Sequence, residues 1–346
     1  MVVWLYPYLP LTRRVSVGSW TLIPVGDLQD ADAVSADAAE QARGVHALYR
    51  LSGDRRGFGA FVRGVQPVGE ELDSAGLGLL RLAVVPAMLD RNPSRADPGD
   101  EPDNAGHAMC TSENALLFGH GVDPEGYTAF SYGTMVQMFV GGARVGESQD
   151  MIDPPSELML PIFRPQLDEV YCAAAYDVLA NLADDSPDLP GAIRWLEVGW
   201  SNSRSVSQQA HVLAFRAGFD VLFGGADTRE IRGKLSELLD PETAVRTPRE
   251  WDDHHGRHYG PFELTDLEWW FQSFALLRNR IAHGGEVPEA DWNFDDGVPH
   301  VWHAERNLRR AIKQTVANAG HEDVLLDPFE RIARRFALEM IDDDQP

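Results

Sequence analysis

The 346-residue chain has few cysteines and few lysines, and it contains no long apolar run. With Cys110 and Cys172 as its only cysteines, no disulfide framework is expected, and a reducing cytoplasm is the expected location. The absence of any run of about 18 uncharged apolar residues excludes a membrane-spanning helix, and no membrane partner is expected. The first residues lack a basic region and a cleavage site, so they predict a strand, not a signal peptide.

Positive charge is also scarce, because the formal net charge is -24 at pH 7 and only Lys234 and Lys313 are lysines. A protein this acidic repels polyanions at long range. Capture of nucleic acid by a broadly basic surface is therefore not expected. A local basic site on the acidic body stays open as an alternative.

Residues 1–150 predict a strand-rich domain punctuated by glycine and proline, whose role the sequence leaves open. The predicted strands are Val2–Tyr8, Trp20–Val25, Val45–Leu51, Phe58–Val62 and Phe130–Val140. Residues 77–89 fit either a strand or a buried helix, because periodicity does not separate the two. Residues 90–106 predict a loop, and a second boundary is expected at 150–156.

From about residue 164 the pattern becomes helical, and residues 160–346 predict an all-helical domain. The predicted helices are Leu167–Leu182, Ala192–Val198, one from the capping box Ser205–Gln208 to Phe223, one from the N-cap Asp227 to Leu239, and two after Val301 and Val324. The expected fold class is thus α+β, with a strand-rich domain followed by a helical bundle.

One further helix has both of its ends marked in the sequence. Thr265 and Glu268 form a capping box, and Gly284-Gly285 supplies the stop. Between them, apolar residues at spacings of three and four form one stripe: Leu267, Trp270, Phe274, Leu277 and Ile281. The sequence therefore predicts an amphipathic helix that packs on a core.

The last turn of this helix carries Arg278, Asn279 and His283. Asn279 and His283 share a face, whereas Arg278 and His283 are separated by about 140° around the axis. Two such helix ends related by a two-fold axis would form one polar cleft. Histidine can transfer the proton of a 2′-hydroxyl or of the leaving oxygen, and arginine can stabilise the charged transition state. The cluster suits RNA cleavage without a metal.

The motif resembles the R-N-x-x-x-H signature of the HEPN superfamily, in the segment Arg278-Asn279-Arg280-Ile281-Ala282-His283. Within that superfamily, it is most similar to the Apea-like group from prokaryotic defence systems. The resemblance implies a helical bundle that forms a homodimer and acts as an endoribonuclease without metal or cofactor. It implies catalytic roles for Arg278 and His283 and a motif role for Asn279. It also implies service as a toxin or antiviral effector.

Two other interpretations of the motif stay open. Basic residues in the last turn of a helix are favoured by the macrodipole alone, and Arg278 could pair with Glu268 or Asp266. Alternatively, the helical domain is a non-catalytic interaction module, and the N-terminal domain binds a ligand or protein. In the enzyme, that N-terminal domain is the expected contact for a regulatory partner or trigger.

Other polar clusters are weaker candidates. The segment 252–258 contains metal-ligating residue types, but it predicts a loop, and no second block of ligands follows at a recognisable spacing. We therefore expect no metal site, and a zinc-dependent hydrolase is the weaker alternative. Cys172 lies on an apolar helix face, which indicates inert packing. The residues that could position RNA are Arg280, His255, His258, Arg306, Arg309 and Arg310.

Overall fold

The computed structural model describes residues 3–6, 9, 11, 13–27, 50–51, 55–56, 60–64, 74–89, 116–120, 127–132, 135–140, 143–147, 166–183, 187–200, 207–225, 227–240, 243–253 and 255–326. The predicted loop at 90–106, the boundary at 150–156, Cys110 and all but the first residues of the helix after Val324 lie outside these ranges. The chain divides into two compact units, Met1–Pro93 with Asp103–Ala180, and Ser94–Pro102 with Asn181–Pro346. The described residues contain both helices and strands, as the α+β prediction requires.

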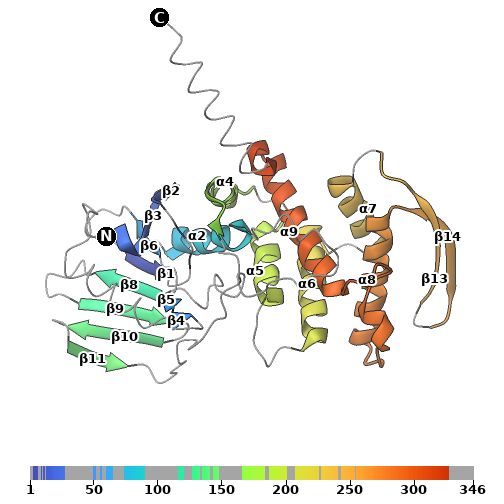
Figure 1. Ribbon diagram of the computed structural model, residues 1–346, viewed down its shortest axis with the longest axis horizontal. Coiled ribbons are helices and arrows are strands. Elements are labelled where there is room, and N and C mark those ends of the chain that lie inside the picture. Colours follow the sequence, from blue (N-terminus) through green and yellow to red (C-terminus); the bar gives the residue numbers. More distant parts are fainter. Residues whose placement is uncertain are drawn as a thin grey trace, which may run out of the picture. The chain divides into compact units, whose positions relative to one another are not determined.

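An antiparallel eight-stranded sheet is the main element of the first unit (Figure 1). Its strands, in spatial order, are β11 (Ala143–Glu147), β10 (Met135–Val140), β9 (Tyr127–Tyr132), β8 (Leu116–His120), β1 (Val3–Tyr6), β6 (Ala60–Gly64), β3 (Trp20–Pro24) and β2 (Val15–Val17). Strand β1 joins the two halves, since Trp4 is opposite both Val62 and Leu117. Two short pairs accompany the sheet: β4 (Arg50–Leu51) with β5 (Arg55–Arg56), and β7 (Met88–Leu89) with β12 (Gln166–Leu167).

The apolar run at 77–89 forms helix α2 (Ser74–Ala87) followed by β7. Helix α4 (Glu169–Ala180) packs on α2 and on β2, with Tyr171, Cys172 and Ala175 buried. This helix was expected in the C-terminal domain, but the structure groups it with the first unit. Its apolar face is covered by residues nearly a hundred positions earlier in the chain, which local periodicity does not reveal.

The turn between β2 and β3 depends on a glycine. Gly18 has a φ of +56°, and a Cβ there would overlap the ring of Tyr176 on α4. A residue with a side chain would be strained in this backbone conformation and would also push α4 away from the turn. The β2–β3 turn and α4 are therefore fitted to each other within the first unit.

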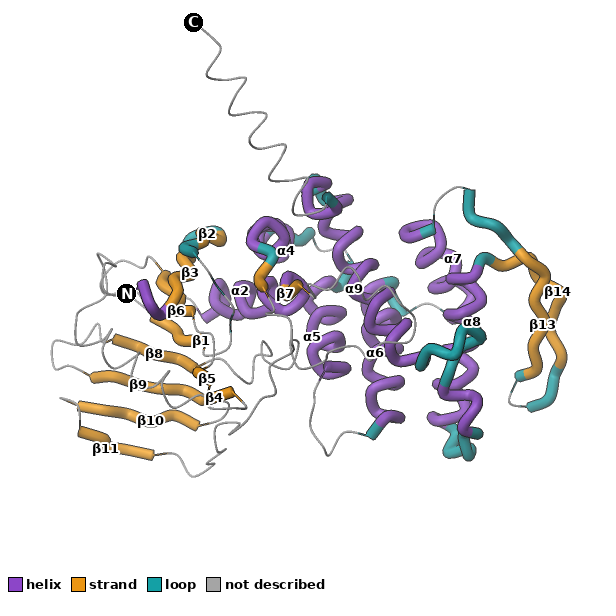
Figure 2. Tube along the Cα trace, in the orientation of Figure 1, coloured by secondary structure: helices purple, strands orange, loops and turns teal. Residues whose placement is uncertain are grey.

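In its described residues, the second unit contains a bundle of five α-helices and one hairpin (Figure 2). The helices are α5 (Leu189–Trp200), α6 (Gln208–Leu222), α7 (Thr228–Leu239), α8 (Asp266–Ala282) and α9 (His300–Asn318), and the hairpin is β13 (Thr247–Asp252) with β14 (His258–Leu264). Helix α6 contacts α5, α8 and α9. Aromatic residues of α6 and α8 form the centre of its core: Phe219, Trp270, Phe271 and Phe274.

The hairpin corrects the prediction that residues 160–346 are all helical. The predicted loop at 252–258 is the connection between its strands, since Asp252 ends β13 and His258 begins β14. In β13 the side chains alternate, with Thr247, Arg249 and Trp251 half-buried and the residues between them exposed. Trp251 packs on Tyr259 of β14 and on Trp269 of α8, at ring-centroid distances of 6.0 and 6.2 Å. Residues 247–252 thus carry a period-two pattern of mixed polar and aromatic residues, which is typical of a strand with one covered face.

The predicted ends of α7 and the predicted C-terminus of α6 are confirmed, whereas α5 is longer at both ends than the predicted Ala192–Val198. Asp227 caps α7 by accepting a hydrogen bond from the Glu230 N–H, and positive φ angles at Gly224 and Gly225 follow the end of α6. The predicted capping box at Ser205 is wrong by two residues, because Ser207 is the N-cap and accepts from the Ala210 N–H. The shift changes the entry into α6 but not the face that it buries.

Among the described residues, no helix combines the length and the apolar character needed to cross a membrane.

Candidate functional site

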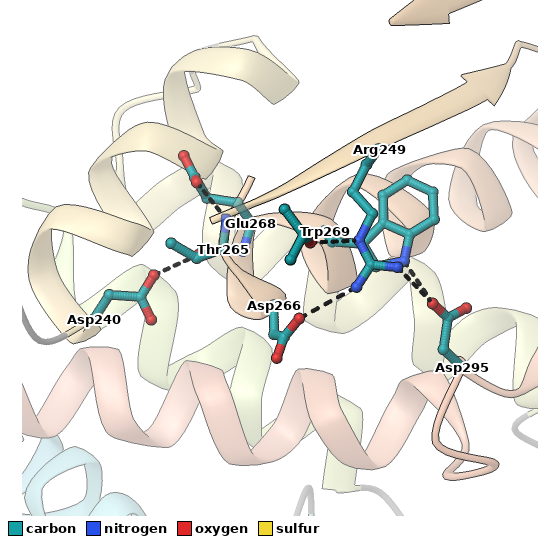
Figure 3. Close-up of polar contacts among 8 residues, drawn as sticks. Asp240, Arg249, Thr265, Asp266, Glu268, Trp269 and Asp295 are labelled. Carbon is teal, nitrogen blue, oxygen red and sulfur yellow. Dashed lines mark hydrogen bonds and ion pairs between the residues drawn. The ribbon is translucent and has the colours of Figure 1, made fainter. Parts of the chain in front are cut away.

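Helix α8 begins at a fully formed capping box (Figure 3). The Thr265 hydroxyl accepts the Glu268 N–H at 3.1 Å, and the Glu268 carboxylate accepts the Thr265 N–H at 2.9 Å. The same hydroxyl donates to Asp240 at the end of α7, at 2.7 Å. Buried Glu268 also pairs with Arg246 at 2.9 Å. The start of the motif helix is thus fixed both locally and to α7.

Arg249 of the hairpin forms ion pairs with two other carboxylates near the start of α8. Its guanidinium lies 3.3 Å from Asp266 and 3.5 Å from Asp295, above the ring of Trp269 (Figure 3). The Trp269 indole donates to the same Asp295 carboxylate at 2.7 Å. Asp266 thus pairs with Arg249 and Glu268 with Arg246, and among the described residues neither carboxylate pairs with Arg278.

The C-terminal end of α8 presents the motif. His283 is the C-cap, and its N–H donates to the Asn279 carbonyl at 3.0 Å. Gly284, with a φ of +69°, reverses the chain, as the predicted stop requires. His283 is exposed, whereas Arg278 and Asn279 are half-buried. The helix therefore ends with an exposed imidazole beside two partly covered polar side chains.

Arg278 is held by a neutral partner. Its Nη1 donates to the Asn279 side-chain oxygen at 3.1 Å, and no carboxylate pairs with it in the part of the chain that the structure describes. A guanidinium bound only to an amide keeps its full charge available for an anion. Asn279 thus orients the arginine within one chain.

Arg216 of α6 is a second cation close to Arg278, and sequence reasoning missed it. Its side chain is only 7% exposed and pairs with Asp220 at 2.9 Å. Burial lowers the pKa of Arg216, Asp220 raises it, and the positive charge of Arg278 lowers it further. The available signal was a charged residue at position 216, among the apolar positions of a predicted helix face, with a carboxylate four residues later.

The other predicted RNA-positioning residues already have partners. Arg280 pairs with Asp291 of the 3-10 helix η4 (Glu289–Trp292), and His258 lies 3.0 Å from Asp252. The three arginines of α9 contact their own helix or α7: Arg306 with His303, Arg309 with Glu305, and Arg310 with Asn307 and the Leu239 carbonyl. Arg280 lies within the motif itself, and none of these contacts of the other residues includes Arg278 or Asn279.

The tip of the hairpin is organised by Asp253. Its carboxylate accepts the backbone N–H groups of His255 and Arg257 and the Arg257 guanidinium. Desolvation opposes these contacts, but together they hold the pKa of Asp253 well below its ordinary value. Across the described residues, which exclude His254, no three His, Cys, Asp or Glu side chains are grouped so that they could hold a metal ion.

Cys172 has the buried environment that its apolar helix face predicts. It is fully buried on α4, and this burial raises the pKa of its thiol far above the ordinary value. A thiol that stays protonated is not a nucleophile. The interpretation of Cys172 as a packing residue is confirmed.

Comparisons of the chain with known protein families, with curated proteins and with solved structures gave no match.

Proposed function

We propose that this protein is a metal-independent endoribonuclease with a HEPN-like helical domain. In this proposal, the active site is composite and forms where two copies bring the C-terminal ends of α8 together. Arg278 and His283 are its catalytic residues, and Asn279 orients Arg278. The biological role is that of a toxin or antiviral effector acting in the cytoplasm, with the first unit as the contact for a regulatory partner.

The observation that carries this proposal is that Arg278 is only half-buried and has no carboxylate partner among the described residues. The interaction-module alternative expects this arginine in a buried pair within its own chain. Instead, Arg278 is half-buried and donates to the neutral Asn279 side chain. One helical turn after Asn279, the exposed His283 supplies an imidazole at the surface.

The chemistry follows from these two side chains. His283 takes the 2′-hydroxyl proton or returns a proton to the leaving 5′-oxygen, which bond cleavage at a phosphodiester requires. Arg278 donates paired hydrogen bonds to the non-bridging oxygens, whose charge rises in the transition state. Neither step uses a metal ion.

The test is an RNA-cleavage assay with EDTA present throughout, comparing the wild type with His283→Ala. We expect a loss of at least about a hundredfold, the usual contribution of a general acid or base. His321→Ala, a histidine outside the site, is the matched control. Cleavage that persists in His283→Ala contradicts the proposal, and absence of cleavage by the wild type favours the interaction module.

The composite site is tested in the same assay by mixing two inactive variants. If Arg278 and His283 of one site come from different copies, a dimer of Arg278→Ala with His283→Ala keeps one intact pair. Random mixing should then restore roughly a quarter of the wild-type rate, since half of the dimers are mixed. No recovery would place both residues of a site in the same chain.

A further inference from the structure

We infer that Arg216 and Arg278 together form a binding site for a phosphate group, contributed by two helices of the same bundle. The identification of the ligand as the phosphodiester of an RNA rests on the function proposed above. The presence of an anion site does not, because it is argued from the arrangement of α6 and α8. Arg216 belongs to no part of the motif and would contact the substrate in addition to Arg278 and His283.

Phe271 of α8 relates the positions of the two arginines. The guanidinium carbon of Arg216 lies 5.0 Å from the Phe271 ring centroid. Residues 271 and 278 are seven apart and lie on one face of the helix, and helical side chains lean toward the N-terminus, which favours an approach of Arg278 to this ring. Helices α6 and α8 are in contact, and the positive charge of Arg278 lowers the pKa of Arg216, so the two cations are within electrostatic reach of each other.

The local charge is unbalanced. Asp220 is the carboxylate that pairs with Arg216, and Arg278 donates only to Asn279 within the described chain. Of these two guanidinium groups, only that of Arg216 has a carboxylate partner among the described residues, although the formal net charge of the protein is -24. Like charges in a partly buried setting repel each other strongly, and an anion between them removes the repulsion. This locally positive site is the alternative that the acidic composition left open.

The donor set fits phosphate better than other anions. Arg278 can offer paired N–H donors to tetrahedrally arranged oxygens. Arg216 donates from Nε to Asp220 and from Nη1 to Thr228 at 3.4 Å, and it lies on Phe271, so its remaining N–H groups are fixed and little side-chain entropy is lost on binding. The Arg216 side chain is 7% exposed and Asp220 is 30% exposed, so the pair meets solvent on the side of Asp220.

The experiment measures binding by the full-length protein of a fluorescein-labelled RNA whose 2′-hydroxyls are methylated, so that it is not cleaved. Inorganic phosphate is the competitor at constant ionic strength. We expect Arg216→Gln to weaken both ligands roughly tenfold, because a hydrogen bond between charged groups is lost. Asp220→Asn should tighten both a few-fold, because it removes a carboxylate that repels the anion and competes for Arg216. Arg194→Gln, an exposed arginine of α5, is the matched control.

The opposite signs separate binding from folding. If Arg216 serves only to pair with Asp220, both substitutions lower the melting temperature and neither changes affinity, which overturns the inference. Unchanged affinity in Arg216→Gln, or failure of phosphate to compete, also overturns it. If cleavage requires His283 but not Arg216, the proposed function survives alone. If phosphate binding requires Arg216 in a protein that cleaves no RNA, the anion site survives alone.

Discussion

At the scale of single residues, two histidines at the start of α9 are buried against the aromatic core of the second unit. His300 lies near Phe274 and Phe294, and His303 near Trp270, with centroid distances of 5.8 to 6.3 Å. His303 bridges Asp296 and Arg306 through its two ring nitrogens. His300 has a buried Nδ1 without a hydrogen-bond partner among the described residues. The two rings therefore occupy different electrostatic environments.

This burial predicts a loss of stability in mild acid. Desolvation, followed by the charge of His303, lowers the pKa of His300 to about 4 from 6.5. Between pH 6.5 and 4, His300 is protonated in the unfolded chain but stays neutral in the folded protein. The free energy of unfolding therefore falls as the pH drops from 6.5 to 4. The difference corresponds to about 3 kcal/mol. Chemical denaturation at a series of pH values measures it.

The matched variants separate this residue from general acid effects. His300→Phe keeps an aromatic ring beside Phe274 and removes the titrating group, so the acid dependence between pH 6.5 and 4 should flatten. His258→Gln, at an exposed histidine, should keep the wild-type dependence. An unchanged slope in His300→Phe would mean that another group causes it.

At the scale of elements, α8 is the helix that the sequence specified most completely. The capping box, the buried positions Trp270, Phe274 and Leu277, and the glycine stop lie where the sequence predicts them. Leu267 and Ile281 of the predicted stripe are only half-buried, and Phe271 is buried outside it. The confirmed features were predictable because each depends on residues within one or two turns. The hairpin that leads into α8 was not, because Trp251 gains its partners from Trp269 and from Arg232 of α7.

The cap of α8 gives a prediction at this scale. Thr265→Ala removes the acceptor for the Glu268 N–H and the donor to Asp240, both in a buried setting. We expect the free energy of unfolding to fall by about 1–2 kcal/mol, as for other lost N-caps. Thr265→Ser keeps both hydrogen bonds and should lose much less. Equal losses in the two variants would show that the methyl group, not the hydroxyl, matters.

At the scale of the whole molecule, the two units divide the chain at a place that the sequence does not mark. The change to helical periodicity near residue 164 suggested a boundary at 150–160, but α4 packs on α2 and β2 in the first unit. A truncation that starts at residue 160 therefore carries an exposed apolar helix face with Tyr171 and Cys172. One that starts at residue 181 does not.

This difference is measurable. We expect residues 181–346 to unfold cooperatively on heating and to stay monodisperse by light scattering, apart from any dimer. Residues 160–346 should aggregate at the same concentration, because contiguous exposed apolar surface promotes association. If the longer fragment is instead the more stable and less aggregated one, α4 belongs to the helical bundle.

The sequence by itself determined what is local in this protein: the acidic composition, the mixture of a strand-rich half and helical segments, and the motif helix with its caps. These follow from propensity, periodicity and hydrogen bonds between near neighbours. Only the tertiary structure decided which helix joins which unit, which residues cover the half-buried face of the hairpin before α8, and that the charge of Arg278 reaches Arg216 of α6. These depend on contacts between residues far apart in the chain, whose energies outweigh local preference.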